Sequence, residues 1–105
     1  MVLQVRRELV ERNYAAVVAE IDNERAAALG RAGRKVDLAI GRCRRLAATL
    51  DAGSRTTGRR EAIAEYREAR RSFDLARWEL CVHREALNLN DHSWIDRAYP
   101  PPPHL

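Results

Sequence analysis

The chain has little of what builds most catalytic, metal-binding or membrane-spanning proteins. Its 105 residues include two cysteines, Cys43 and Cys81, which are too few for a disulfide framework or a zinc site. No apolar run approaches the ~20 residues that a membrane-spanning helix needs. The first residues lack the basic leader and the continuous apolar stretch of a secretory signal. We therefore expect a cytoplasmic protein that makes no membrane contact.

Strand-forming residues are sparse, and they never alternate with polar residues over a useful length. Alanine, arginine, glutamate and leucine dominate instead, and all four favour helices. A domain of 105 residues buries only a modest fraction of its surface, so association with a second copy is a natural way to complete its core. The composition therefore predicts an all-α protein that self-associates.

The first helix is expected over about residues 3–50. Its apolar positions recur at steps of three and four residues, which average close to the helical repeat of ~3.6. Gly30 and Gly33 are the alternative boundary, because each glycine costs ~1 kcal/mol against alanine inside a helix. The stripe keeps its phase through them and no capping residue follows, so we favour one continuous helix of ~70 Å. The stripe comprises Leu3, Val10, Tyr14, Val17, Ile21, Ala28, Ala32, Val36, Ile40, Cys43, Leu46 and Leu50.

A loop at residues 51–58, with Thr56 or Thr57 as the cap, separates this helix from a second one over about residues 59–89. In the second helix, large apolar residues seven apart alternate with alanines, which permits close approach to another helix. A further apolar stripe lies on the opposite face, and two opposed stripes indicate burial on two sides. The first stripe contains Tyr66, Phe73, Leu80 and Leu87, and the second contains Leu75, Trp78, Val82 and Leu89.

The last residues form a separate tail. Asp91 or Ser93 is placed to cap a short helical turn, and the four prolines that follow favour polyproline II. Polyproline segments can dock in aromatic grooves of partner proteins. The apolar residues just upstream favour a packed terminus instead. We divide the chain into a hairpin, residues 1–90, and a tail, residues 91–105, that packs on the hairpin or on a partner.

The two helices are expected to fold back near residue 54 into a long antiparallel hairpin. Cys43 and Cys81 then lie more than ~20 Å apart, too far for a disulfide, so we predict two free, mostly buried thiols. The first helix outruns the second by roughly sixteen residues. That apolar excess needs cover, which we expect from the tail and from a second copy that completes a four-helix bundle with coiled-coil packing. The expected oligomer or partner interface comprises Leu3, Val10, Tyr14, Val17, Leu75, Trp78, Val82, Leu89, Trp94 and Tyr99.

Positive charge gathers at the loop end of the hairpin. Residues 30–60 carry nine basic residues against two acidic ones, a balance of +7 in a chain whose net charge is +4. Such a tip can attract nucleic acid, phosphate or an acidic protein. The alternative is a solvated tip that is partly paired with glutamates across the hairpin. The candidate anion-binding residues are Arg42, Arg44, Arg45, Arg55, Arg59 and Arg60.

No motif for catalysis stands out. The serines lack a nucleophile-elbow setting, and the glycines form no phosphate-binding loop. Glu79 and His83 are four residues apart, but the repeated Glu-x-x-His pattern of a carboxylate metal site is missing, which makes a metal site the weaker alternative. We expect no catalysis, no cofactor and no small-molecule substrate. The leading hypothesis is a helical interaction or structural protein, either a homodimer or larger homo-oligomer, or a small accessory subunit of a larger complex.

Overall fold

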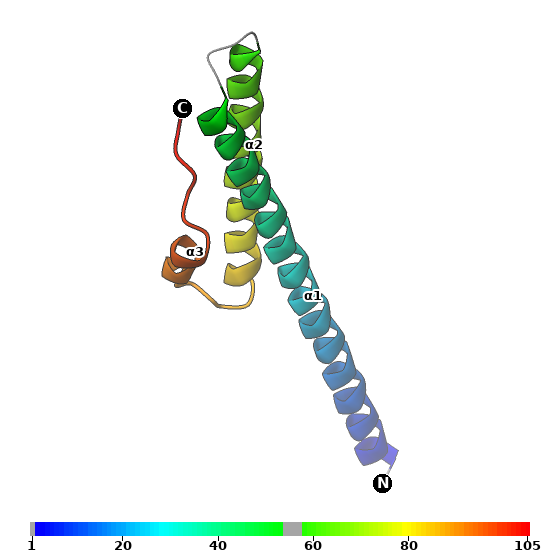
Figure 1. Ribbon diagram of the computed structural model, residues 1–105. Helices are drawn as coiled ribbons and strands as arrows, with labels where there is room; N and C mark the ends of the chain where they lie inside the picture. The colour runs from blue at the N-terminus through cyan, green and yellow to red at the C-terminus, as the bar shows by residue number, and fades with distance from the viewer. Residues whose placement is uncertain (1, 54–57) are drawn as a thin grey trace.

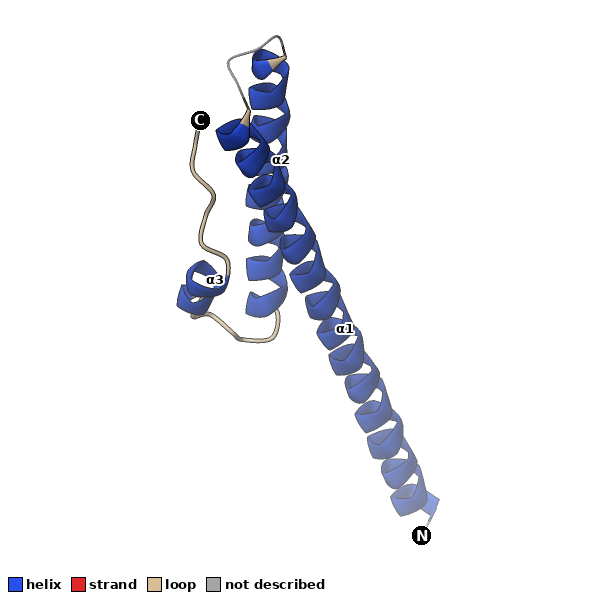
Figure 2. Cartoon of the chain, in the orientation of Figure 1, coloured by secondary structure: helices blue, strands red, loops and turns tan. Residues whose placement is uncertain are grey.

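The computed structural model describes residues 2–53 and 58–105, which form three helices (Figures 1 and 2). Helix α1 spans Val2–Ala52, α2 spans Arg59–Glu85 and α3 spans Ser93–Ala98. No strand occurs in these two described ranges. The prediction of an all-α protein is therefore confirmed.

Helix α1 determines the shape of the molecule. It continues for 51 residues through Gly30 and Gly33, as the unbroken apolar phase predicts. The longest dimension of the chain is 83 Å, against 23 and 14 Å for the other two. The large excess of one dimension means that α1 extends well beyond the part of it that the rest of the chain covers.

Helix α2 runs back along the second half of α1 (Figure 1). Two ion pairs join the helices: Lys35 Nζ lies 3.6 Å from Glu79 Oε2, and Arg42 Nη2 lies 3.8 Å from Glu65 Oε1. Along α1 the residue number rises from 35 to 42 while that of its partner in α2 falls from 79 to 65, so the two helices are antiparallel. We call residues 28–52 of α1 together with α2 the two-helix body, and residues 2–27 of α1 the arm.

The core of the two-helix body is the seam that the heptad in α2 predicts. Tyr66 and Phe73 have no exposed surface, nor do Val36 and Cys43 on the facing side of α1. The alanines that alternate with the large residues let the helices approach closely, so the large side chains fill the space between them. The buried apolar residues are Ala32, Val36, Ile40, Cys43, Leu50, Tyr66, Ala69, Phe73, Ala76, Leu80 and Ile95.

Helix α2 ends at Glu85, four residues before the boundary expected from its apolar pattern. Asn88 takes a left-handed conformation with φ of 61°, and the Leu89 amide donates to the Arg84 carbonyl at 2.9 Å. Asparagine tolerates this conformation better than most residues, and the six-to-one hydrogen bond closes the helix. The expectation that Leu87 and Leu89 continue the two stripes of α2 is therefore wrong, because both follow its end.

The caps of α2 and α3 also differ from expectation. Thr56 and Thr57 lie outside the described residues, and the cap position of α2 is Gly58 in a left-handed conformation. The cap position of α3 is His92 rather than Asp91 or Ser93. The Asp91 carboxylate instead accepts the Ser93 amide at 3.0 Å, and hydrogen bonding to Ser93 lowers the pKa of Asp91.

The tail lies along α2, not on the arm (Figure 1). Ile95 of α3 is fully buried against the two-helix body. Arg77 of α2 binds the Asp96 carboxylate at 2.7 Å, and farther along the tail the Tyr66 hydroxyl donates to the Pro103 carbonyl. The expectation that the tail helps to cover the apolar excess of the first helix is therefore wrong. Ile95 finds the closer apolar surface beside the core of the body.

Candidate partner-binding surface

The arm presents a long apolar surface that no other described part of the chain covers. Every residue from 2 to 27 is exposed, including Leu3 at 80% and Tyr14 at 72%. This exposure follows from geometry, because α2 ends opposite the middle of α1 and the tail turns back along α2. The exposed large apolar residues of the arm are Val2, Leu3, Val5, Leu9, Val10, Tyr14, Val17, Val18 and Ile21.

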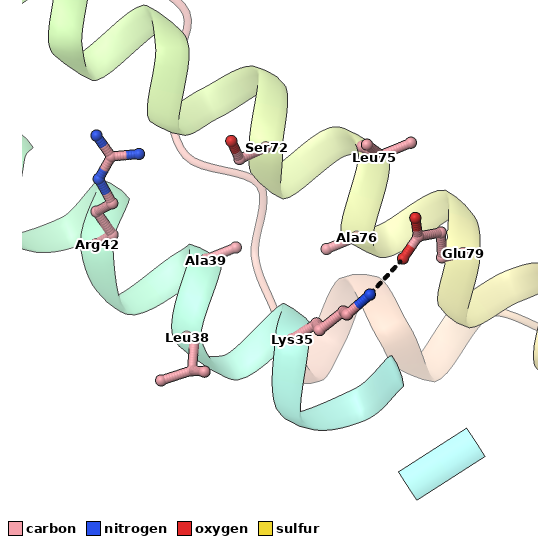
Figure 3. A pocket seen from close by; sticks show the side chains of 8 residues that line it. All are labelled: Lys35, Leu38, Ala39, Arg42, Ser72, Leu75, Ala76 and Glu79. Carbon is pink, nitrogen blue, oxygen red and sulfur yellow. Dashed lines mark ion pairs between the residues drawn. The ribbon is translucent and has the colours of Figure 1, made fainter. Parts of the chain in front are cut away.

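A shallow groove of about 360 Å³ runs between α1 and α2 on the two-helix body (Figure 3). The Lys35–Glu79 ion pair bridges it, and Leu38 beside it is 74% exposed. The methyl groups of Ala39 and Ala76 leave the groove open where larger side chains would fill it. The lining residues are Lys35, Leu38, Ala39, Arg42, Ser72, Leu75, Ala76 and Glu79.

The arm stripe and the groove lie on one face of α1. Leu3, Ile21 and Ala39 are successively 18 residues apart, which is five full turns of an α-helix at ~3.6 residues per turn. The same spacing relates Val17 of the arm to Lys35 of the groove. The apolar stripe of the arm therefore continues into the seam that α2 covers, at Ala32, and also reaches the edge of the open groove, at Ala39.

The outer stripe of α2 is exposed beside this groove. Trp78 is 61% exposed, and Leu75 and Val82 are also open to solvent. Leu75 is itself a groove residue, so the outer stripe of α2 borders the groove. Of the four residues expected on this stripe, Leu89 alone lies beyond the end of α2.

Two residues of the expected interface, Tyr99 and Trp94, make contacts within the chain itself. Tyr99 packs against the core, where burial and the Asp37 carboxylate raise its pKa. Trp94 lies under the Arg84 guanidinium, which is 5.0 Å from the ring centre. The structure therefore uses both aromatic residues to hold the tail in place.

Arg84 is a structural residue that the sequence pattern did not reveal. His83 beside it is half-buried, whereas Arg84 is buried, with 9% exposure. Its guanidinium donates to the Asp91 carbonyl at 2.7 Å and to His92 Nδ1 at 3.3 Å. A buried charge is tolerated when hydrogen bonds satisfy it, and here those bonds fix the turn that leads into α3.

The basic tip is only partly neutralised. Arg42 pairs with Glu65, and Arg59 donates to the Leu50 carbonyl at 3.4 Å. Among the residues that the structure describes, Arg44, Arg45 and Arg60 are exposed and make no ion pair. Arg55 lies outside the described residues. The predicted tip residues therefore divide into two that bind the chain itself and three that face solvent.

The cysteines are free, with Cys43 buried and Cys81 half-buried. Burial raises the pKa of the Cys43 thiol, although Arg70 nearby opposes the shift. A thiol held protonated in a core is a poor nucleophile. We therefore assign Cys43 a packing role in the buried cluster that contains Val36 and Tyr66.

The Tyr66 hydroxyl gives the fold an expected pH dependence. Burial raises its pKa above the ordinary value of 10.0, and only the protonated phenol can donate to the Pro103 carbonyl. The stabilisation is fully present below the unfolded pKa and is lost as the pH rises through the folded pKa. We expect chemical-denaturation stability to fall above about pH 10, and less steeply in Tyr66→Phe. The exposed control Tyr14→Phe should follow the wild-type curve, and an unchanged profile in Tyr66→Phe would contradict this role.

Within the described ranges, no group of three or more His, Cys, Asp and Glu side chains is arranged to hold a metal ion. Glu79, the carboxylate of the weak metal alternative, is paired with Lys35. In the same part of the chain, no helix combines the length and apolar character that crossing a membrane requires.

Comparison of the chain with protein-family models, with curated proteins and with solved structures finds no match. A proposal about function therefore rests on the exposed surface of the arm and the groove.

Proposed function

We propose that this chain is a non-enzymatic helical interaction protein, acting as a homo-oligomer or as a small accessory subunit of a larger complex. The single observation that carries the proposal is the arm. It remains helical for residues 2–27 while every one of its residues is exposed. In this proposal the two-helix body is a helical hairpin, and association completes a helical bundle.

The physical argument concerns the stability of the arm. Helices in proteins owe most of their stability to packing of an apolar face, and isolated helices are marginal in water. An uncovered apolar patch of more than a few hundred Å² marks an interaction site in a soluble protein. The arm carries nine large exposed apolar residues on one continuous helix. A partner that packs on this surface stabilises the helix and removes the patch from water.

Light scattering together with a hydrophobic dye tests this proposal on the whole chain. We expect either a mass above that of one chain, or a monomer that binds the dye strongly through the arm. A compact monomer at micromolar concentration that binds no dye would contradict the proposal.

A second candidate function is electrostatic binding of nucleic acid or of an acidic protein at the tip, favoured by the unpaired Arg44 and Arg45. Binding of a labelled DNA duplex should then weaken steeply with salt, because each phosphate contact releases a counterion. The variant R44E/R45E should bind much more weakly at low salt, whereas R71E/R97E, with the same change in net charge, should not. Salt-insensitive binding, or equal losses in the two variants, would exclude this candidate.

A further inference from the structure

We infer that two copies of this chain pair their α1 helices antiparallel, so that the arm of each copy occupies the groove of the other copy's two-helix body. The inference rests on the proposed function and selects its homo-oligomeric form. The two halves of the interface are the apolar stripe of the arm and the face of the two-helix body that holds the groove bordered by Leu38 and Leu75.

The lengths of the two halves match. The arm, residues 2–27, is about 39 Å long, and α2, which limits the two-helix body, is about 40 Å long. The centre of α1 lies at residue 27, where the arm ends and the body begins. Two copies paired antiparallel about that point therefore overlap along their full length, with an arm beside a body at each end.

The interface closes on itself. The arm stripe and the groove share one face of α1, as the spacing of Leu3, Ile21 and Ala39 shows. A two-fold axis through residue 27 places this face of α1 against the same face of the second copy. Each arm then contacts the groove of the other copy, so the contact occurs twice. A self-complementary surface of this kind gives a closed dimer, not an open polymer.

The register brings apolar residues together. About a two-fold axis at residue 27, each residue faces the one whose number completes a sum of about 54, so Val17 lies level with Leu38 of the other copy. Ile21 lies level with residue 33, within about one turn of the Lys35–Glu79 pair that marks the position of Trp78 along the body. Apolar residues of the arm thus lie level with Leu38 and close to the level of Trp78 on the other copy.

The contact area is that of a stable dimer. A helix about 10 Å wide and about 40 Å long covers roughly 400 Å² of the two-helix body beside it, so two arms on two bodies bury about 1,600 Å² in total. Specific and stable interfaces bury about this much surface. The area buried between the two copies is therefore enough for a stable dimer without another partner.

Charge selects the antiparallel arrangement. Residues 30–60 carry a balance of +7, whereas residues 1–29 carry four basic and five acidic residues. Parallel pairing would place two strongly basic ends side by side and raise the repulsion between them. Antiparallel pairing places each basic end against the slightly acidic arm of the other copy.

Distances between spin labels test the arrangement directly. In a full-length background with Cys43→Ala and Cys81→Ala, a label is placed at Glu11→Cys or, separately, at Ala27→Cys. Antiparallel pairing predicts a label distance within about 25 Å at residue 27 and about 50 Å at residue 11. Short distances at both positions would show parallel pairing, and long distances at both would show pairing through another surface. Either result would overturn the inference while leaving the proposed function intact.

A groove substitution provides the second measurement. Leu38 is exposed, so Leu38→Glu should leave the fold of one chain unchanged while weakening dimerisation at least tenfold. Ala48→Glu adds the same charge on an exposed part of α1 away from the groove and should dimerise as the wild type does. Equal dimerisation of the two variants would overturn the inference. A monomer that binds hydrophobic dye would overturn it and leave the accessory-subunit form, whereas a monomer without dye binding would contradict both.

Discussion

Replacement of Phe73 by alanine is expected to lower the free energy of unfolding by about 3–5 kcal/mol. The Phe73 side chain has no exposed surface, and the Arg70 guanidinium lies 5.7 Å from the centre of its ring. The substitution removes the apolar contacts of the ring and leaves a cavity between α1 and α2. Because small domains are stable by only about 5–15 kcal/mol, this loss is a large share of the total. Urea denaturation followed by circular dichroism measures it.

The matched control for this prediction is Val5→Ala. Val5 is half exposed on the side of the arm opposite Leu3 and Val17, so its replacement should change stability by less than about 0.5 kcal/mol. A loss below about 1 kcal/mol in Phe73→Ala would show that the heptad of α2 is not the core of the fold.

The double variant Val10→Glu and Val17→Glu is expected to abolish self-association. Both side chains lie on the arm stripe and are exposed in a single chain, so the two-helix body should fold as before. In a symmetric dimer four valines are replaced, and each buried valine contributes about 1.5 kcal/mol or more. The dissociation constant of the dimer should therefore rise at least about a thousand-fold, since each 1.4 kcal/mol is about tenfold. Light scattering over a concentration series measures this shift.

The control for the arm is Ala16→Glu with Ala19→Glu. Both alanines are exposed on the side of the arm away from the stripe, and the pair adds the same charge. Association of this control should resemble that of the wild type. If both double variants associate equally well, the stripe is not the contact surface.

The fold could be predicted wherever one periodicity dominates. The 3.6-residue phase of α1 continues through Gly30 and Gly33, and the structure contains one helix there. The heptad of α2 identified Tyr66, Phe73 and Leu80 as core residues, and all three are buried. A helix with a long, regular apolar stripe can be predicted from sequence because packing of the whole stripe stabilises the helix along its length.

The remaining features depend on contacts that periodicity does not encode. Helix α2 ends early because Asn88 adopts a left-handed conformation, and the presence of an asparagine there was the one available signal. The position of the tail depends on Arg84, whose hydrogen bonds reach Asp91 and His92 across the turn. Arg84 belongs to neither apolar stripe, so the stripes alone do not predict that Trp94 lies under its guanidinium.

The candidate surface was predictable in part. The uncovered arm followed from comparing the lengths of the two helices, and the exposure of Val10, Tyr14 and Val17 agrees with that comparison. The groove could not be predicted, because it depends on how closely α1 and α2 approach at Ala39 and Ala76.

Sedimentation equilibrium of the unmodified chain at micromolar concentration tests whether a second copy covers the arm. We predict a single species with twice the chain mass of 12.0 kDa, dissociating on dilution. A species of 12.0 kDa throughout the micromolar range would contradict it.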